Sequence, residues 1–213
     1  MEIQLDRVIP TYFEKEKING SGIWDKHISF NKGQHVQVIA PSGSGKTSLI
    51  HFIYRLRNDY SGSILYDTTN TRNITPDKLS VYRQKKISIV FQDLRLFPDQ
   101  TVFQNLELKR QLDPFHPELK IKEMCERLGI ASRLDKIARI CSYGEQQRIA
   151  IIRSLMQPFD FLLLDEPFSH LDDANRSKAM DLIVEECSVR NASMIFADLQ
   201  LVDFFKNGVV YQL

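Results

Sequence analysis

The sequence has few of the features that mark secreted, membrane-spanning or redox-active proteins. Its only cysteines are Cys125, Cys141 and Cys187, and their spacing matches neither a metal site nor a redox motif, which predicts a reducing compartment. No apolar run approaches the roughly 18 residues of a transmembrane helix, and residues 1–6 do not resemble a signal peptide. We therefore expect a chain that does not itself cross a membrane.

An excess of one charge is also missing. The 28 lysines and arginines nearly balance the 27 acidic residues, which gives a net charge of +1 at pH 7. The chain has no basic tract and no coiled coil, so we expect no nucleic-acid partner. With 213 residues, of which 43% are apolar, the chain is long enough to bury a sizeable core.

Hydrophobic periodicity predicts an α/β body that is interrupted by a helical insertion. Strand patterns are found at residues 2–8, 26–30, 34–39, 62–66, 87–91, 161–165, 193–197 and 208–212. Helical patterns are found at residues 45–57, 77–85, 101–112, 118–128, 143–156, 173–189 and 199–206. We predict a single domain with an α/β core at 1–94 and 158–213 and a helical subdomain at about 95–157.

The stretch APSGSGKT, residues 40–47, is a candidate phosphate-binding loop. Its Gly and Ser content would suit a flexible turn equally well, and the usual pattern has Gly at the position of Ala40. A strand pattern precedes it and a helical pattern follows it, and this context favours the phosphate loop. Backbone N–H groups and the helix N-terminus would then hold phosphates, with Lys46 on the β- and γ-phosphates and Thr47 on Mg²⁺. The predicted nucleotide contacts are Ala40, Pro41, Ser42, Gly43, Ser44, Gly45, Lys46, Thr47 and Ser48.

A pair of carboxylates supplies the chemical partner of this loop. Asp165 and Glu166 follow the apolar run 161–164, which predicts a strand buried on both faces. Its C-terminal end is the edge at which open parallel sheets place ligands. Asp165 is suited to bind Mg²⁺ and Glu166 to polarise an attacking water.

Three further motifs make the chain resemble the ATP-binding subunits of ABC transporters. Gln92 follows a predicted strand and is similar to the family's Q-loop, and Ser142, Gly144 and residues 145–148 (Glu-Gln-Gln-Arg) are similar to its signature motif at the start of a helix. Residues 169–172, which end in Asp172, are similar to its D-loop. The resemblance covers essentially the whole chain and implies a P-loop NTPase of the ABC ATPase fold, with the helical subdomain inserted in a mixed-sheet core.

The resemblance also implies a mechanism and partners. Two such domains pair head to tail around two ATP molecules, and hydrolysis with Mg²⁺ moves integral membrane permease subunits. A homodimer is favoured over a heterodimer, with the protein cytoplasmic and peripheral on the cytoplasmic face of the inner or plasma membrane. Ser142, Gly144, Glu145 and Asp172 would contact nucleotide, and Gln92 would serve both Mg²⁺ and catalysis. Tyr12 stands where the family stacks a ring on adenine, and Phe13 is the alternative.

The chain departs from the family's pattern at three positions. Ala40 replaces the first glycine of the phosphate loop, and Tyr143 replaces the first glycine of the signature motif. Ala197 occupies the position of a histidine that contacts the γ-phosphate, and His170 is more consistent with an interface or surface residue than with a replacement for it. The loss of that ring predicts slow hydrolysis with near-normal ATP binding, and Ala197→His would raise turnover if the space admits it.

Two questions are open at this stage. Leu96, Phe97, Phe103 and Leu106 could anchor a helix of the membrane subunit or could form the core of the helical subdomain. The chain could be an ATPase most like those of lipoprotein release, macrolide export and the FtsE type, which drive transport or mechanical signalling. Alternatively, it could be a slowly hydrolysing, ATP-gated clamp with a regulatory role.

Overall fold

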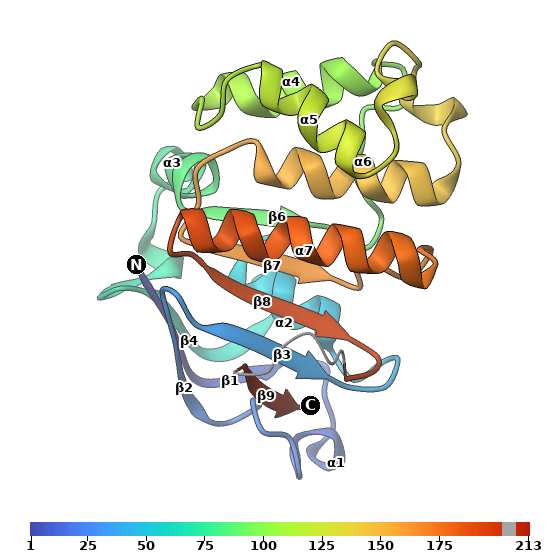
Figure 1. The fold of residues 1–213 in the computed structure, drawn as a ribbon. Helices are drawn as coiled ribbons and strands as arrows, with labels where there is room; N and C mark the ends of the chain where they lie inside the picture. Colours follow the sequence, from blue (N-terminus) through green and yellow to red (C-terminus); the bar gives the residue numbers. More distant parts are fainter. Residues whose placement is uncertain (202–207) are drawn as a thin grey trace.

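Two β-sheets form the centre of the molecule, and they differ in strand direction (Figure 1). The computed structural model describes residues 1–201 and 208–213. The antiparallel sheet has the order β2-β1-β4-β5, with β1 at Glu2–Pro10, β2 at His27–Asn31, β4 at Tyr60–Tyr66 and β5 at Thr69–Asn70. The parallel sheet has the order β6-β7-β8-β3-β9, with β3 at His35–Ile39, β6 at Ile87–Val90, β7 at Phe161–Asp165, β8 at Ser193–Asp198 and β9 at Val209–Gln212. Every predicted strand is confirmed, and only the short β5 was not expected.

The helices agree with the predicted periodicity at most positions. They are α1 (Lys15–Ile18), α2 (Lys46–Ile53), α3 (Pro76–Lys85), α4 (Val102–Leu112), α5 (Leu119–Arg127), α6 (Tyr143–Leu155) and α7 (Asp173–Val189), with 3₁₀ turns at Thr71–Asn73, Ala131–Arg133 and Ala138–Ile140. The predicted extension of α2 to residue 57 was wrong, because Arg55 has a φ of 57° and this left-handed conformation ends the helix. The predicted helix at 199–206 falls largely outside the described residues.

Local sequence explains where several helices begin. Thr101 and Gln104 form a capping box at the start of α4, in which each side chain accepts a hydrogen bond from the other residue's backbone N–H. The side chain of Thr75 caps α3 and Pro76 occupies its first turn, where a missing N–H has no cost. These starts satisfy backbone groups that the helices cannot pair internally.

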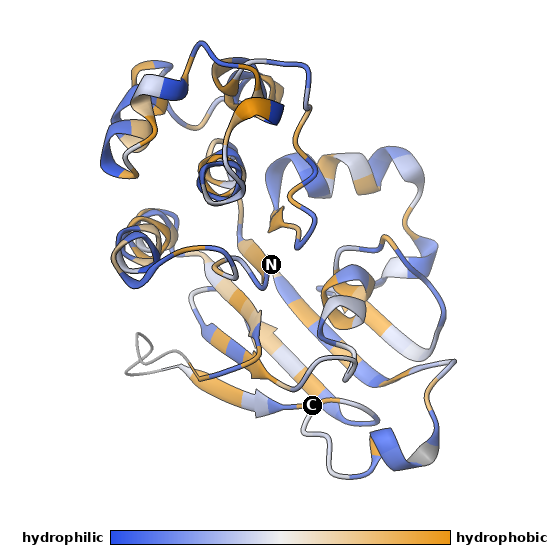
Figure 2. Cartoon of the chain, turned by 90° about the vertical axis from the view of Figure 1, so that its right-hand side faces the viewer, coloured by the Kyte–Doolittle hydropathy of each residue, from blue (hydrophilic) through white to orange (hydrophobic). Residues whose placement is uncertain are grey.

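The parallel sheet lies between helical layers. In Figure 1, α7 lies in front of this sheet and α2 behind it, while α4 and α5 lie farthest from both sheets, beyond α6. Figure 2 shows that hydrophobic residues gather in the strands at the centre of the molecule, whereas the outer helices contain many hydrophilic residues. None of the helices in the described part of the chain is long and apolar enough to span a membrane.

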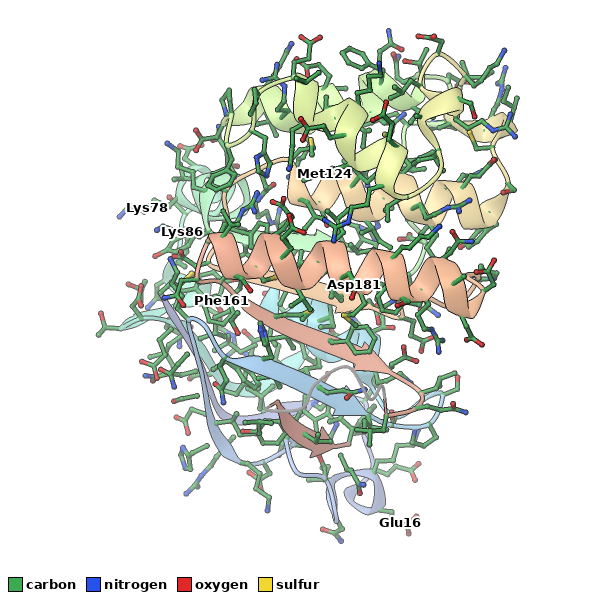
Figure 3. All side chains as sticks on the ribbon, in the orientation of Figure 1. Glu16, Lys78, Lys86, Met124, Phe161 and Asp181 are labelled. Atoms are coloured by element: carbon green, nitrogen blue, oxygen red, sulfur yellow. The ribbon has the colours of Figure 1, made fainter. Side chains whose placement is uncertain are left out.

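Strand β7 contributes to two hydrophobic clusters at once. Leu162 and Leu164 pack with residues of α4 to α7, including Met124 of α5, which Figure 3 labels between α5 and α6. Phe161 and Leu163 pack with the cluster that contains α2 and the antiparallel sheet. The strand is therefore buried on both faces, as its apolar run predicted, and its two carboxylates emerge at the end of a rigid element.

Three helices form the region that the sequence marked as a subdomain. Helices α4 and α5 contact α6, and α6 also contacts β6 and α7. Because α6 belongs to both layers, the limits at about 95 and 157 stay a prediction.

Candidate active site

The predicted phosphate loop joins β3 to α2, and its two glycines have different roles. Gly43 and Gly45 have φ values of 79° and 100°, in the region that favours glycine. A Cβ on Gly45 would lie 2.8 Å from Cζ of Phe13 and 3.1 Å from Cζ2 of Trp24, whereas one on Gly43 would meet no atom within 4 Å. Gly45 is thus required by its backbone and by packing, and Gly43 by its backbone alone.

Ala40 occupies a position at which a Cβ is tolerated. It is not among the described residues with positive φ, and it is only 3% exposed. Its N–H donates a hydrogen bond of 3.2 Å to the carbonyl of Asp198. The first departure from the family's pattern therefore leaves the start of the loop in an ordinary backbone conformation.

Lys46 lies beneath the loop and is 4% exposed. Its ammonium group donates to the carbonyl oxygens of Ala40 at 2.8 Å and Pro41 at 3.1 Å. It also lies 3.3 Å from Oε1 of Glu166. The first residue of α2 and the residue that follows β7 are thus brought into contact, as their predicted roles require.

A hydrogen-bonded cluster connects the remaining catalytic candidates. Oγ1 of Thr47 lies 3.3 Å from Oε1 of Gln92 and 3.2 Å from Oδ1 of Asp165. Nε2 of Gln92 lies 3.5 Å from Oε2 of Glu166. Residues 47, 92 and 165–166 come from three separate segments of the chain, and the structure places them in one site.

The environment of Asp165 suits a divalent cation. Burial raises the pKa of its carboxyl to about 6, with a contribution from the nearby charge of Glu166, while the hydrogen bond from Thr47 acts in the opposite direction. Its Oδ2 is buried and has no hydrogen-bond partner. A bound cation would compensate for this unpaired oxygen, and the carboxylate, hydroxyl and amide oxygens of the site are donors that Mg²⁺ accepts. The described ranges contain no cluster of three or more His, Cys, Asp or Glu residues that could hold a metal ion.

Glu166 has a strained backbone. Its φ is 46°, an uncommon value for a residue with a side chain. Its N–H donates a hydrogen bond of 2.9 Å to the carbonyl of Ala197, and its carbonyl accepts one of 3.4 Å from Nε2 of Gln147. These bonds on both sides fix the turn that directs the carboxylate towards Lys46 and Gln92.

The aromatic candidate Tyr12 lies at the entrance of the same site and is 48% exposed. Its hydroxyl lies 2.5 Å from Oγ of Ser48, and the guanidinium of Arg57 lies 5.0 Å from its ring centre. Phe13 packs edge-on against both Tyr12 and Trp24 and so supports the loop at Gly45. A cavity of ≈ 290 Å³ is lined by Tyr12, Phe13, Ser42, Gly43, Gly45, Lys46, Thr47, Ser48, Arg57, Gln92 and Glu166.

Sequence reasoning missed one residue of this site, Arg57, and one contact, that of Gln147. Arg57 follows the end of α2 and lies on the ring of Tyr12, but a single arginine after a helix gives no recognisable signal. Pro41 and Ser44 do not line the Lys46 cavity, although they were predicted to contact nucleotide. They line a neighbouring cavity of ≈ 480 Å³ instead. Ser42 and Gly43 line both this cavity and the Lys46 cavity. Gln147 belongs to the stretch that resembles the signature motif, but its contact was not predicted: it is 1% exposed and donates to the carbonyl of Glu166.

The signature residues form the start of α6. Ser142 and Glu145 make a capping box, and Glu145 also pairs with Arg133 at 2.8 Å. A Cβ on Gly144 would lie 2.9 Å from the carbonyl oxygen of His170, so α6 approaches the D-loop closely there. Asp172 caps α7 by accepting from the N–H of Asn175 at 2.8 Å. None of these signature and D-loop residues lines the cavity around Lys46.

Ala197 is part of the core. It is fully buried on β8, pairs with Val38 and Asp165 in the parallel sheet, and belongs to the cluster around α2. His170 lies against Tyr143 with ring centres 4.2 Å apart and does not line the Lys46 cavity. The structure therefore offers little room for a ring at 197.

The open question about residues 94–106 has a divided answer. Leu106 is fully buried in the cluster of the helical layer, and Leu96 and Phe103 pack against it. Phe97 is 51% exposed and lines a separate cavity of ≈ 250 Å³. Three of the four residues are core, and one faces a surface recess.

Comparison with known proteins agrees with this arrangement. The family model described as ABC transporter matches residues 25–169, which include the phosphate loop, Gln92, the start of α6 and both carboxylates. The chain belongs to the ABC transporter family. It is thus an ATP-binding and ATP-hydrolysing subunit of the ABC type, as the resemblance implied.

Curated relatives include ATP-binding proteins of different transport systems. The chain is 31% identical over 204 residues to the aliphatic sulfonates import ATP-binding protein SsuB of Bacillus cereus. The aligned region covers 95% of this chain and 78% of SsuB. It is 32% identical over 171 residues to the lipoprotein-releasing system ATP-binding protein LolD of Legionella pneumophila, over 79% of this chain and 75% of LolD. Import and lipoprotein-release proteins are thus similar to the chain to nearly the same degree.

Solved structures support the fold. The dimeric structure of MJ0796, a bacterial ABC transporter cassette, matches with a TM-score of 0.77 at 26% identity, over 93% of this chain and 88% of that chain. Its post-hydrolysis state bound to ADP and Pi matches with a TM-score of 0.80 at 24% identity. The predicted fold class is confirmed, and the clamp alternative gains no support from the comparisons.

Proposed function

We propose that this ABC subunit binds ATP with Mg²⁺ at the Lys46 cavity, pairs with a second copy of itself, and transmits the resulting movement to integral membrane subunits. The cluster that joins Lys46, Thr47, Gln92, Asp165 and Glu166 carries this proposal. It unites a phosphate-binding cation, donors for Mg²⁺ and a candidate base at the mouth of one glycine loop.

Each member of the cluster has a distinct task in this proposal. Lys46 and the loop N–H groups bind the phosphates, and Tyr12 offers a ring for the base. Thr47, Gln92 and Asp165 would hold Mg²⁺, which neutralises charge on the β- and γ-phosphates when bound. Glu166 lies close enough to Lys46 and Gln92 to orient a water at the γ-phosphate.

The second half of the site comes from a partner copy in this proposal. Ser142 is exposed at the N-terminus of the 13-residue helix α6, and Asp172 is the exposed cap of α7. Neither lines the cavity of its own chain. A helix N-terminus favours an anion, so the γ-phosphate of a partner's ATP would suit this surface. The similar MJ0796 cassette was solved as a dimer, and one chain type suffices for a two-fold pair.

The membrane partner would contact the recess near Phe97. This recess is lined by Tyr54, Ile89, Phe91, Arg95, Phe97, Asn105, Leu108, Lys109, Leu112, Arg153 and Ser154. Exposed apolar side chains beside the helical layer suit the apolar face of an incoming helix. The names of SsuB and LolD refer to import and to a lipoprotein-releasing system, and such roles support a peripheral position on the cytoplasmic face of the membrane.

Sedimentation of the purified chain with and without ATP and Mg²⁺ tests the proposal. We expect Glu166→Gln to bind ATP, fail to hydrolyse it and sediment as a dimer. Lys46→Ala should remain monomeric at the same nucleotide concentration. A Glu166→Gln protein that stays monomeric at saturating ATP, or a Lys46→Ala protein that dimerises, would contradict the proposed function.

A further inference from the structure

Tyr143 is the departure from the family's pattern that the proposed function leaves unexplained. It is the first residue of α6 and is 44% exposed. Its hydroxyl donates a long hydrogen bond of 3.4 Å to the backbone carbonyl of Gln92. Its ring lies 4.2 Å from that of His170, at an interplanar angle of 56°. The side chain therefore spans from the signature motif to the Q-loop and the D-loop of its own chain.

The same side chain borders the predicted metal site. A cavity of ≈ 370 Å³ is lined by Thr47, His51, Gln92, Asp93, Tyr143 and Asp165. Tyr143 contacts the backbone carbonyl of Gln92, and the side chain of Gln92 reaches Thr47 and Glu166. A glycine at position 143 could make neither contact with the Q-loop nor contact with His170.

The D-loop side of Tyr143 is itself fixed. The N–H of His170 donates to Oε1 of Gln147 at 3.0 Å, and Nδ1 of His170 lies 2.9 Å from Oγ of Ser169. Gln147 also donates to the carbonyl of Glu166. The ring of Tyr143 thus packs on a surface that is anchored to the residue after β7.

We propose that Tyr143 is a positioning residue, which holds Gln92 in reach of Thr47 and Glu166 and thereby couples the start of α6 to the metal site of the same chain. This inference rests on the proposed function, because it assumes that Thr47, Gln92 and Asp165 hold Mg²⁺. It also accounts for a bulky residue in the signature motif. The ring packs on the D-loop and the Q-loop of its own chain.

Metal affinity measured without turnover tests this role. Mn²⁺ binding to the full chain is followed by electron paramagnetic resonance in the presence of a non-hydrolysable ATP analogue, for wild type, Tyr143→Ala and Tyr143→Phe. Tyr143→Ala removes one hydrogen bond and the packing of the ring, and we expect a roughly 3- to 10-fold weaker Mn²⁺ affinity. Tyr143→Phe keeps the ring and should lose about twofold. Binding of the nucleotide without metal should not change.

A matched control and a double variant separate positioning from general damage. Leu119→Ala removes another exposed large residue, 65% exposed, at the first position of α5, and should leave Mn²⁺ affinity and nucleotide binding unchanged. In a Gln92→Ala background, Tyr143→Ala should weaken Mn²⁺ binding no further, because its effect passes through Gln92. Thermal unfolding of each variant reports the stability of the fold separately.

Each result decides between the inference and its alternatives. Equal Mn²⁺ affinity in wild type and Tyr143→Ala, or a full additional loss in the Gln92→Ala background, would overturn the role of Tyr143. Asp165→Asn tests the metal site itself, since it should abolish Mn²⁺ binding whether or not Tyr143 contributes. If Asp165→Asn binds Mn²⁺ normally, the proposed metal site fails and not merely the positioning role.

Discussion

The substitution Ala197→His would restore the ring that the family's pattern places next to the γ-phosphate. Ala197 is fully buried, and its neighbours across the sheet are Val38 and Asp165. Overpacking a core position costs about 1–3 kcal/mol, and burying a polar imidazole without a partner costs about 1–3 kcal/mol more. We therefore expect the free energy of unfolding to fall by about 2–6 kcal/mol.

For a chain of this length, such a loss corresponds to a Tm lower by roughly 5 to 20 °C. The assay is thermal unfolding together with single-turnover ATP hydrolysis at a temperature where both proteins are folded. We expect no gain in turnover, because a ring forced into the core would displace Asp165 and the turn at Glu166. The sequence-based expectation that Ala197→His raises turnover depended on free space at position 197, and the structure offers little.

Ala192→His is the matched control. Ala192 immediately precedes β8 and is 1% exposed, so the added ring meets similar burial at the opposite end of the strand. It should lower Tm to a comparable extent while the turnover of the folded protein stays at the wild-type level. An Ala197→His protein with unchanged Tm and faster hydrolysis would refute the reasoning, because it would show that the site admits the ring.

Four further substitutions address the loop and the carboxylate. Lys46→Ala should reduce ATP affinity by at least tenfold in a fluorescent-nucleotide titration, because it removes the buried cation of the loop. Gly45→Ala should lower stability by roughly 1–3 kcal/mol in urea unfolding, since its φ is positive and Phe13 blocks a Cβ. Ala40→Gly should change ATP affinity by less than about 1 kcal/mol in the same titration. Single-turnover hydrolysis in wild type should be roughly 10²–10³-fold slower than in relatives that have the histidine, and near zero in Glu166→Gln.

Contrary results would be equally informative. Retained ATP affinity in Lys46→Ala would remove the phosphate loop from the site, and a stable Gly45→Ala protein would mean that Phe13 moves aside. A large gain in affinity for Ala40→Gly would show that Ala40 is a defect. Brisk hydrolysis in wild type would show that another group does the work of the missing histidine.

Local patterns predicted the parts of the site that depend on one segment. The strand before Ala40 and the glycines after it specify the loop, because periodicity and turn chemistry act over a few residues. Asp165 and Glu166 could be predicted at a sheet edge, since the apolar run before them needs burial on both faces. Their role as partners of the loop came from chemistry and from the resemblance to a family.

The contacts that sequence reasoning missed join distant segments of the chain. Arg57 lies on the ring of Tyr12, 45 positions earlier in the chain (57 − 12), and Gln147 donates to the carbonyl of Glu166 from α6, the helix that precedes β7. The orientation of Tyr143 depends on His170 and Gln92, which approach α6 only in the folded chain. No periodicity or composition within one segment specifies such contacts, because they arise when separate elements pack.

The strand order explains why Ala197 matters even though its side chain is small. Strand β8 lies between β7 and β3, so its C-terminal end separates Glu166 from the start of the phosphate loop. The carbonyl of Ala197 accepts from the N–H of Glu166, and the carbonyl of the next residue, Asp198, accepts from the N–H of Ala40. The backbone of these two residues therefore fixes the distance between the carboxylate and the loop, while Lys46 crosses the same gap to reach both. A larger side chain at position 197 would disturb this backbone. We therefore expect the loss of stability in Ala197→His to exceed any benefit to catalysis.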